Sequence, residues 1–293
     1  MCVVTGRPGI YVLIMNEQNP VILVHGMWHG SWCWSRLTGQ LAASGVPSIA
    51  VDLDGHGLKA RSPRSRWSRP FDPAAFATEP APSAGVTASS AAADLVAQIR
   101  LAGNGRPCVV VAHSMGGVVA TAAAELAPEL FAELVYLAAF APVSGVPAAD
   151  YIASPENEGE KVGALLRADP AVVGALRLDP GDPAGHAAAR DAFYHDVDEP
   201  TAEAAIALLT PDGPAGIPGE TFPITPARYG SVPHTYIVCT GDRAVPAALQ
   251  RRFVEEIDAV SVAPTTVVEL ATSHSPFLSA PEELAEVIVK VGR

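Results

Sequence analysis

The feature that most constrains the fold is a single serine between an apolar run and an alanine-rich stretch. Residues 109–119 read VVVAHSMGGVV, with Ser114 at the junction. A buried strand that turns sharply into a helix forces such a side chain outward, and small neighbours let the strand and the helix pass close to it. Ala112 stands where this A-x-S-x-G pattern usually has glycine, a difference of one methyl group. We predict a nucleophile elbow at Ser114; the alternative is an ordinary strand–turn–helix capped by a hydroxyl.

The rest of the chain alternates short β-branched runs with longer helical stretches. This alternation is typical of an α/β fold, a mostly parallel twisted sheet with helices on both faces. The predicted strands cover 21–24, 47–51, 108–112, 134–138, 235–239 and 265–270, and a further strand is expected at 10–15. The predicted helices cover 34–44, 89–102, 117–127, 247–257 and 282–291, with Ser89 as a candidate cap.

Two stretches interrupt this alternation. Residues 59–90 are rich in Pro, Ser and Ala and hold five basic residues, so we expect a long basic loop. This loop is either solvated or a docking patch for an anionic substrate or an acidic carrier protein. Residues 141–233 are too long for a simple crossover. An insertion at the carboxyl end of a parallel sheet lies over its ligand crevice, so we predict a cap at 141–233 and a core formed by 1–140 and 234–293.

A serine nucleophile needs a base and a group that orients the base. In this topology they follow in the order serine, carboxylate, histidine, each just after a strand. Asp242 lies just past the predicted strand 235–239, and His274 lies in the loop after 265–270. We therefore predict a catalytic triad of Ser114, Asp242 and His274.

Acyl transfer also needs two donors for the developing oxyanion. The residue after the nucleophile, Met115, supplies one backbone N–H, and the loop HGMWHG after strand 21–24 supplies the other, which we assign to Met27. Gly26 lets that loop approach the nucleophile. We assign Gly26, Trp28, His113 and Phe140 to the substrate-binding surface.

A metal site and a cofactor are not expected. His25 and His29 are four residues apart but lie in a glycine-bearing loop, whereas a helix would present both to one ion. The D-x-D-x-H run from Asp52 to His56 has no further ligand nearby in the sequence. We therefore predict no metal and no cofactor.

Charge and composition limit the classes of partner that we expect. With 31 acidic and 19 basic residues the net charge is −12, which disfavours nucleic acid. No apolar run is long enough for a transmembrane helix, and the N-terminal run is too short for a secretory signal, so no membrane contact is expected. The four scattered cysteines indicate reduced thiols and a cytoplasmic protein. A small-molecule substrate is the expected partner, and a homodimer is left open.

The motifs HGMWHGSWCW, AHSMGG, CTGDRAVP and TSHSPFLSAP resemble the α/β-hydrolase superfamily over nearly the whole chain. They are most similar to the branch of plant methyl-ester esterases and hydroxynitrile lyases. The resemblance implies the same triad, the same oxyanion donors and no cofactor. The lyases of this branch have a threonine at the position of Gly26 and a lysine at that of Ser275, so these residues favour ester hydrolysis.

The expected function is therefore that of a carboxylic-ester hydrolase, a serine esterase that cleaves a small hydrophobic or aromatic ester through an acyl-enzyme. Trp28, Trp32 and Phe140 are candidates for an apolar pocket. Lactone or thioester hydrolysis and C–C cleavage are alternatives on the same site, because the same serine and oxyanion hole serve any activated carbonyl. A further alternative is a ligand-binding or non-hydrolytic cyclase-type protein that keeps the fold.

Overall fold

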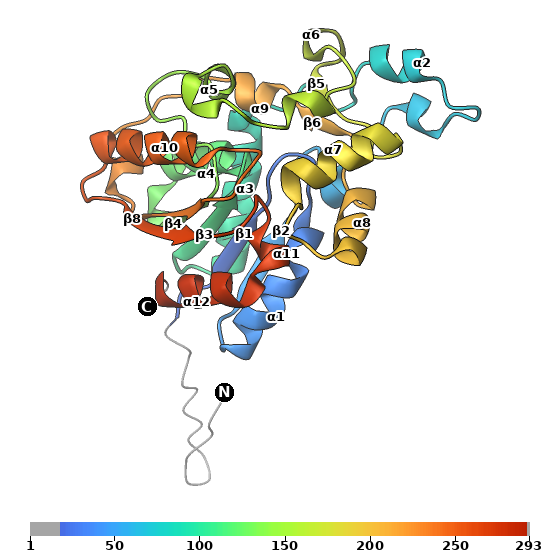
Figure 1. The fold of residues 1–293 in the computed structure, drawn as a ribbon. Helices are drawn as coiled ribbons and strands as arrows, with labels where there is room; N and C mark the ends of the chain where they lie inside the picture. The colour runs from blue at the N-terminus through green and yellow to red at the C-terminus, as the bar shows by residue number, and fades with distance from the viewer. Residues whose placement is uncertain (1–17, 292–293) are drawn as a thin grey trace, which may run out of the picture.

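A single parallel sheet organises the molecule (Figure 1). The computed structural model describes residues 18–291. The strand order is β2-β1-β3-β4-β7-β8, and every neighbouring pair in this sheet is parallel. The strands are β1 (Val21–Val24), β2 (Ser48–Val51), β3 (Cys108–His113), β4 (Phe131–Leu137), β7 (His234–Cys239) and β8 (Thr266–Leu270). The predicted fold class is confirmed, and the strand expected at 10–15 lies outside the described residues.

The central strands are mostly apolar because both faces of the sheet are covered. Every residue of β1, β3 and β7 is buried, as expected for parallel strands between two helical layers. The edge strand β8 is largely exposed and begins with a threonine. Hydrophobic run length therefore distinguishes central strands from edge strands in this chain.

Helices cover the two faces of the sheet in two groups. The chain reverses its direction across the sheet after β2, so right-handed crossovers place the helices that precede and follow the reversal on opposite faces. One group pairs α1 (Ser35–Ala43) with α12 (Pro281–Val291), and the other contains α3 (Ala88–Gly103), α4 (Gly116–Leu126) and α10 (Ala247–Val260). The crevice between β1 and β3 is the switch point at which such sheets bind ligands.

The segment 59–90 differs from the expected long loop. It contains the short 3-10 helix η3 (Arg64–Trp67) and the helix α2 (Pro73–Thr78), which is capped by Asp72. The cap of α3 is Thr87 in a capping box with Ser90, so the assignment to Ser89 is wrong. Ser89 instead donates its N–H and hydroxyl to the carboxylate of Glu220.

The segment between β4 and β7 builds a separate small layer above the carboxyl ends of the strands (Figure 1). Two short strands, β5 (Ala175–Arg177) and β6 (Asp212–Pro214), pair antiparallel. The helices of this segment are α5 (Ala148–Ile152), α6 (Pro170–Val173), α7 (Pro183–Phe193), α8 (Glu199–Ala207) and α9 (Gly216–Gly219), with short 3-10 turns between them. Short elements and many prolines explain why sequence periodicity did not reveal them.

A buried ion pair joins this layer to the 59–90 segment. The Arg177 guanidinium donates to both carboxylate oxygens of Asp212, at 2.6 and 2.7 Å, and also to the backbone oxygens of Phe76 and Glu79. Burying a charge is costly unless the charge is paired and hydrogen-bonded. Here the two charges pair with each other, and the guanidinium also donates to two backbone oxygens. The pair thus fixes β5 and β6 against α2.

The described cysteines and helices also bear on the sequence predictions. Cys33, Cys108 and Cys239 are buried free thiols, as predicted, and Cys2 lies outside the described residues. Between residues 18 and 291, no helix combines the length and the apolar character needed to cross a membrane.

Candidate active site

Ser114 lies on a sharp turn between β3 and α4. Its φ of 52° is in the left-handed region, which a side chain rarely adopts. The turn is held on both sides, because the Ser114 N–H donates to Leu137 and the Ser114 carbonyl accepts from the N–H groups of Gly117 and Phe140. The predicted elbow geometry is thus present, with strain at the serine itself.

Small residues surround this turn because the backbones approach closely. A Cβ on Gly116 would lie 2.3 Å from the carbonyl oxygen of His25, and one on Gly117 would lie 2.3 Å from that of Phe140. A Cβ on Gly26 would lie 2.6 Å from the Ser114 Cβ. A side chain at position 26 would therefore displace the serine.

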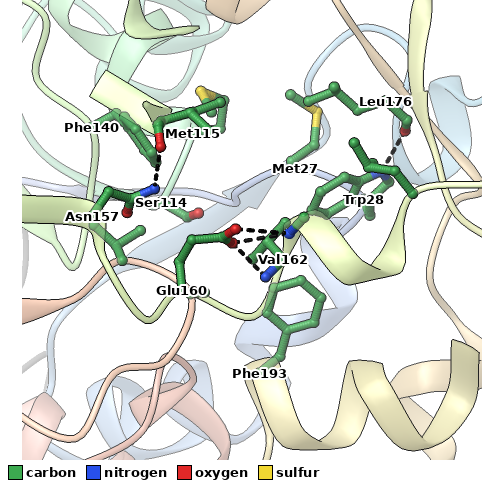
Figure 2. A pocket seen from close by; sticks show the side chains of 15 residues that line it. Met27, Trp28, Ser114, Met115, Phe140, Asn157, Glu160, Val162, Leu176 and Phe193 are labelled. Carbon is green, nitrogen blue, oxygen red and sulfur yellow. Dashed lines mark hydrogen bonds between the residues drawn. The ribbon is translucent and has the colours of Figure 1, made fainter. Parts of the chain in front are cut away.

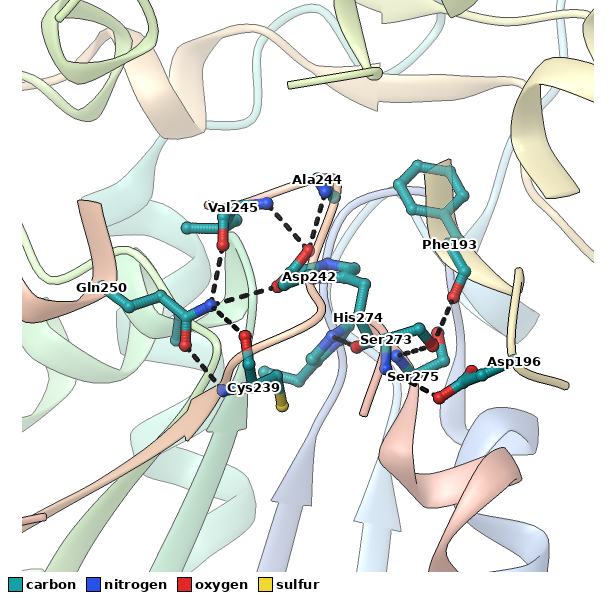
Figure 3. Close-up of polar contacts among 12 residues, drawn as sticks. Phe193, Asp196, Cys239, Asp242, Ala244, Val245, Gln250, Ser273, His274 and Ser275 are labelled. Carbon is teal, nitrogen blue, oxygen red and sulfur yellow. Dashed lines mark hydrogen bonds and ion pairs between the residues drawn. The ribbon is translucent and has the colours of Figure 1, made fainter. Parts of the chain in front are cut away.

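Asp242 and His274 meet at the carboxyl ends of β7 and β8 (Figure 3). The His274 Nδ1–H donates to Asp242 Oδ2 at 2.7 Å, and both side chains are buried. The other oxygen, Oδ1, accepts from the N–H groups of Ala244 and Val245 at 2.7 and 2.9 Å. With its proton on Nδ1, a neutral His274 ring carries its lone pair on Nε2, where it can act as a base.

Gln250, on α10, braces the aspartate loop and was missed by the sequence analysis (Figure 3). It is fully buried, and its amide exchanges two hydrogen bonds with the backbone of Cys239. It also donates to the Val245 carbonyl at 2.7 Å and to Asp242 Oδ2 at 3.4 Å. The only sequence signal was a glutamine on the apolar face of an amphipathic helix.

The histidine loop is held from two sides. The His113 Nε2–H donates to the backbone oxygen of His274 at 2.9 Å. On the other side, the Ser273 N–H donates to Asp196 at 2.7 Å and its hydroxyl to the Phe193 carbonyl (Figure 3). Burial is the main cause that lowers the pKa of His113 well below its ordinary value, and the neighbouring His274 is the second cause. His113 therefore holds the histidine loop as a neutral side chain.

The two residues expected to supply oxyanion donors lie beside Ser114. Met27 and Met115 are both buried and both line the cavity that contains Ser114. Among the hydrogen bonds of residues 18–291, the backbone N–H groups of Met27 and Met115 have no acceptor. Buried backbone donors are nearly always paired, so two open donors beside a serine are a chemically meaningful exception.

The cavity above Ser114 is largely apolar (Figure 2). Trp28 and Phe140 line it as predicted, and the Trp28 indole is fixed by donating to the Leu176 carbonyl at 2.7 Å. The predicted Gly26, Trp32 and His113 are not among the lining residues, and a Cβ on Gly26 would meet Ser114 and His113. The wall opposite the sheet comes from the β4–β7 segment: Ile152, Asn157, Glu160, Val162, Gly163, Leu166, Leu176 and Phe193.

The structure brings the predicted triad residues to the carboxyl ends of the strands, but one of the two expected hydrogen bonds is not formed. Within the described chain, no hydrogen bond joins the Ser114 hydroxyl to His274. Such bonds are often long before substrate binds. The Asp242–His274 bond and the Ser114 turn are therefore the formed parts of the arrangement.

The other histidines near the site are occupied by protein contacts. His25 accepts from the Leu53 N–H, and His29 bonds Met27 O and the Tyr194 hydroxyl. Burial lowers the pKa of His25 and of His29 to about 3. Among residues 18–291, no group of three or more His, Cys, Asp or Glu side chains is arranged to hold a metal ion.

The chain is similar to known proteins over most of its length. A model described as "Alpha/beta hydrolase family" matches residues 21–287. Methylesterase 7 of Arabidopsis thaliana is 27% identical, covering 94% of this chain and 97% of its own. Esterase PIR7B of Oryza sativa subsp. japonica is 27% identical, with 94% and 96% covered. The solved pyrethroid hydrolase of Sphingobium faniae JZ-2 is 22% identical with a TM-score of 0.71, and covers 94% of this chain and 97% of its own.

These comparisons confirm the resemblance predicted from the four motifs. They also support the expected enzyme class, a carboxylic-ester hydrolase, since the curated relatives are named esterases.

Proposed function

Since this chain belongs to the alpha/beta hydrolase family, we propose that it is a serine esterase whose triad is Ser114, Asp242 and His274. The observation that carries the proposal is the buried 2.7 Å bond from His274 Nδ1 to Asp242, on the same sheet edge as the strained Ser114 turn. A histidine oriented in this way is the base that an otherwise unreactive serine hydroxyl needs.

The proposed reaction passes through an acyl-enzyme. The Ser114 hydroxyl oxygen attacks the ester carbonyl carbon while its proton moves to His274 Nε2, and the imidazolium then protonates the departing alcohol. A water activated by His274 cleaves the acyl-enzyme and releases the carboxylic acid. Asp242 stays ionised and stabilises the imidazolium.

We assign the oxyanion hole to the backbone N–H groups of Met27 and Met115. Their lack of an acceptor supports this role, because donors held ready in a buried site stabilise charge that develops in the transition state. The role of Gly26 is then steric: because glycine has no side chain, the Met27 loop can lie against the serine.

We further propose that residues 141–233 act as a cap that closes the substrate cavity. The eight lining residues from this segment support the assignment. Trp28, Phe140 and Phe193 favour a small hydrophobic or aromatic ester, because aromatic side chains bury large apolar areas.

Trapping of the acyl-enzyme tests this function. We expect rapid mixing with p-nitrophenyl acetate to give a burst of p-nitrophenol and an acetyl adduct on Ser114 by peptide mapping. Ser114→Ala should show neither, whereas Ser83→Ala, a buried serine elsewhere, should behave as wild type. Parallel assays with methyl, lactone and thioester substrates identify the preferred carbonyl. An undiminished burst in Ser114→Ala, or a wild-type adduct on a residue other than Ser114, would contradict the assignment.

A further inference from the structure

The cavity carries hydrogen-bond acceptors that the proposed reaction does not use. Besides Ser114 and the indole of Trp28, its polar side chains are Asn157 and Glu160, and no lysine, arginine or histidine lines it. The Trp28 N–H is already taken by the Leu176 carbonyl. On the wall away from the serine, a bound molecule therefore meets two side chains with acceptor oxygens and no cationic side chain.

Asn157 presents one of these acceptors in a fixed orientation. Its side-chain nitrogen donates to the Ile152 carbonyl at 2.9 Å, so the amide cannot be turned without placing two oxygens together. The residue is 4% exposed, and its Oδ1 is buried with no hydrogen-bond partner among the described residues. A buried acceptor without a partner is costly to the fold, so its retention in a cavity wall points to a ligand donor.

Glu160 adds a negative charge to the same wall (Figure 2). Its carboxylate accepts from the N–H groups of Val162 and Gly163 at distances between 2.5 and 3.2 Å. Within residues 18–291 it forms no ion pair, whereas Glu156 and Glu256 both pair with Arg252. A carboxylate offers about four acceptor positions, so capacity is left for a cation.

We propose that Asn157 and Glu160 form an acceptor subsite for a protonated amine on the substrate. A primary ammonium group has three donors and a positive charge, which match a neutral amide oxygen and a carboxylate. A hydroxyl would satisfy Asn157 alone, and a carboxylate on the substrate would be repelled. The favoured substrate is thus an apolar ester with a cationic amine. The assignment of this ligand as an ester rests on the proposed function.

Four matched ligands test the subsite. They are methyl 3-arylpropanoates that differ only in the para group: aminomethyl, hydroxymethyl, ethyl or carboxyl. Binding is measured by calorimetry on Ser114→Ala, which does not depend on turnover. We expect the aminomethyl ester to bind at least tenfold more tightly than the ethyl ester, the hydroxymethyl ester to lie between them, and the carboxyl ester to bind weakest.

Second substitutions in the Ser114→Ala background separate the two acceptors. Glu160→Gln should weaken the aminomethyl ester about tenfold and leave the ethyl ester within about twofold. Asn157→Leu should weaken both donor-bearing esters and spare the ethyl ester. Glu158→Gln, an exposed neighbour that removes the same charge without lining the cavity, should change none of them by more than about twofold. Thermal unfolding checks that each variant folds.

Equal affinity of the aminomethyl and ethyl esters, or no measurable binding of the aminomethyl ester, would overturn the subsite even if a variant failed to fold. Turnover by the wild type is scored separately. Preferential binding of the amine without cleavage of any of the four esters would preserve the subsite and count against the esterase.

Discussion

Gly26 leaves no space for a side chain between the Met27 loop and the nucleophile. A Cβ there would contact the Ser114 Cβ at 2.6 Å and the Ser114 Oγ at 3.1 Å. Both atoms belong to the reacting residue, so a shift cannot be absorbed by a distant flexible group. We therefore expect a single methyl group at this position to reduce the activity more than it reduces the stability of the fold.

Gly26→Ala should lower kcat/KM for ester hydrolysis by about 10²-fold or more, the loss typical of a misplaced nucleophile or a lost oxyanion donor. Steady-state kinetics on a p-nitrophenyl ester measure it. Gly39→Ala is the matched control, because nothing lies within 4 Å of a Cβ there. Gly39 lies in α1, so alanine should add about 0.5–1 kcal/mol of stability and leave the activity unchanged. Full activity in Gly26→Ala would refute the crowding argument.

At the scale of elements, the β5–β6 pair connects the cavity wall to the sheet. Its Arg177–Asp212 ion pair binds α2, and Gly213 of β6 packs against the Met27 side chain. The Thr210 N–H also donates to the Trp28 carbonyl at 2.8 Å. The position of the proposed oxyanion loop thus depends on residues almost two hundred positions away.

Arg177→Met should destabilise the protein by about 3–5 kcal/mol, because it leaves Asp212 as an uncompensated buried charge. Urea unfolding followed by circular dichroism gives the change. Arg251→Ala removes an exposed arginine from its pair with Glu269 and should cost at most about 1 kcal/mol. Similar losses of unfolding free energy in both variants would show that burial does not determine how much the Arg177 pair contributes to stability.

The elements that could be predicted are those whose signal is local. Strands β1, β3 and β7 were predicted to within one residue at each end, because a strand buried on both faces is largely apolar. The start of β4 was missed by three residues, since Phe131–Glu133 mixes apolar and charged side chains. The β5 and β6 strands have three residues each, which is too few for any periodicity.

The site divides in the same way. Ser114, Asp242 and His274 follow strands, so chain order and strand ends were enough to bring them to one edge. Asn157 and Gln250 could not be found, because their roles depend on which distant backbone groups the fold presents to their amides. Sequence pattern reports strand ends, whereas the cavity wall is a product of tertiary packing.

At the scale of the whole molecule, buried histidines couple stability to pH. Burial lowers the pKa of His25 and His29 to about 3, and that of His56 and His234 to about 4. In the unfolded chain these groups have pKa values of about 6.5. The unfolded chain therefore binds more protons below pH 6.5, so acid favours unfolding.

The free energy of unfolding should fall as the pH is lowered from about 6.5 to 4.5, by up to about 1.4 kcal/mol per pH unit for each buried histidine. Denaturant unfolding across this range measures the slope. His234→Gln removes one such group outside the site and should reduce the slope. A free energy that stays constant between pH 7 and 5 would be inconsistent with neutral buried histidines.

Labelling with a fluorophosphonate tests whether His274 activates Ser114. Intact mass and peptide mapping are compared for wild type, His274→Ala and Asp242→Asn, with His186→Ala as a control histidine in the β4–β7 segment. We predict one adduct on Ser114 in wild type and in His186→Ala, none in His274→Ala, and strongly slowed labelling in Asp242→Asn. Folded wild-type protein that takes up no label, or equal labelling of His274→Ala, would contradict it.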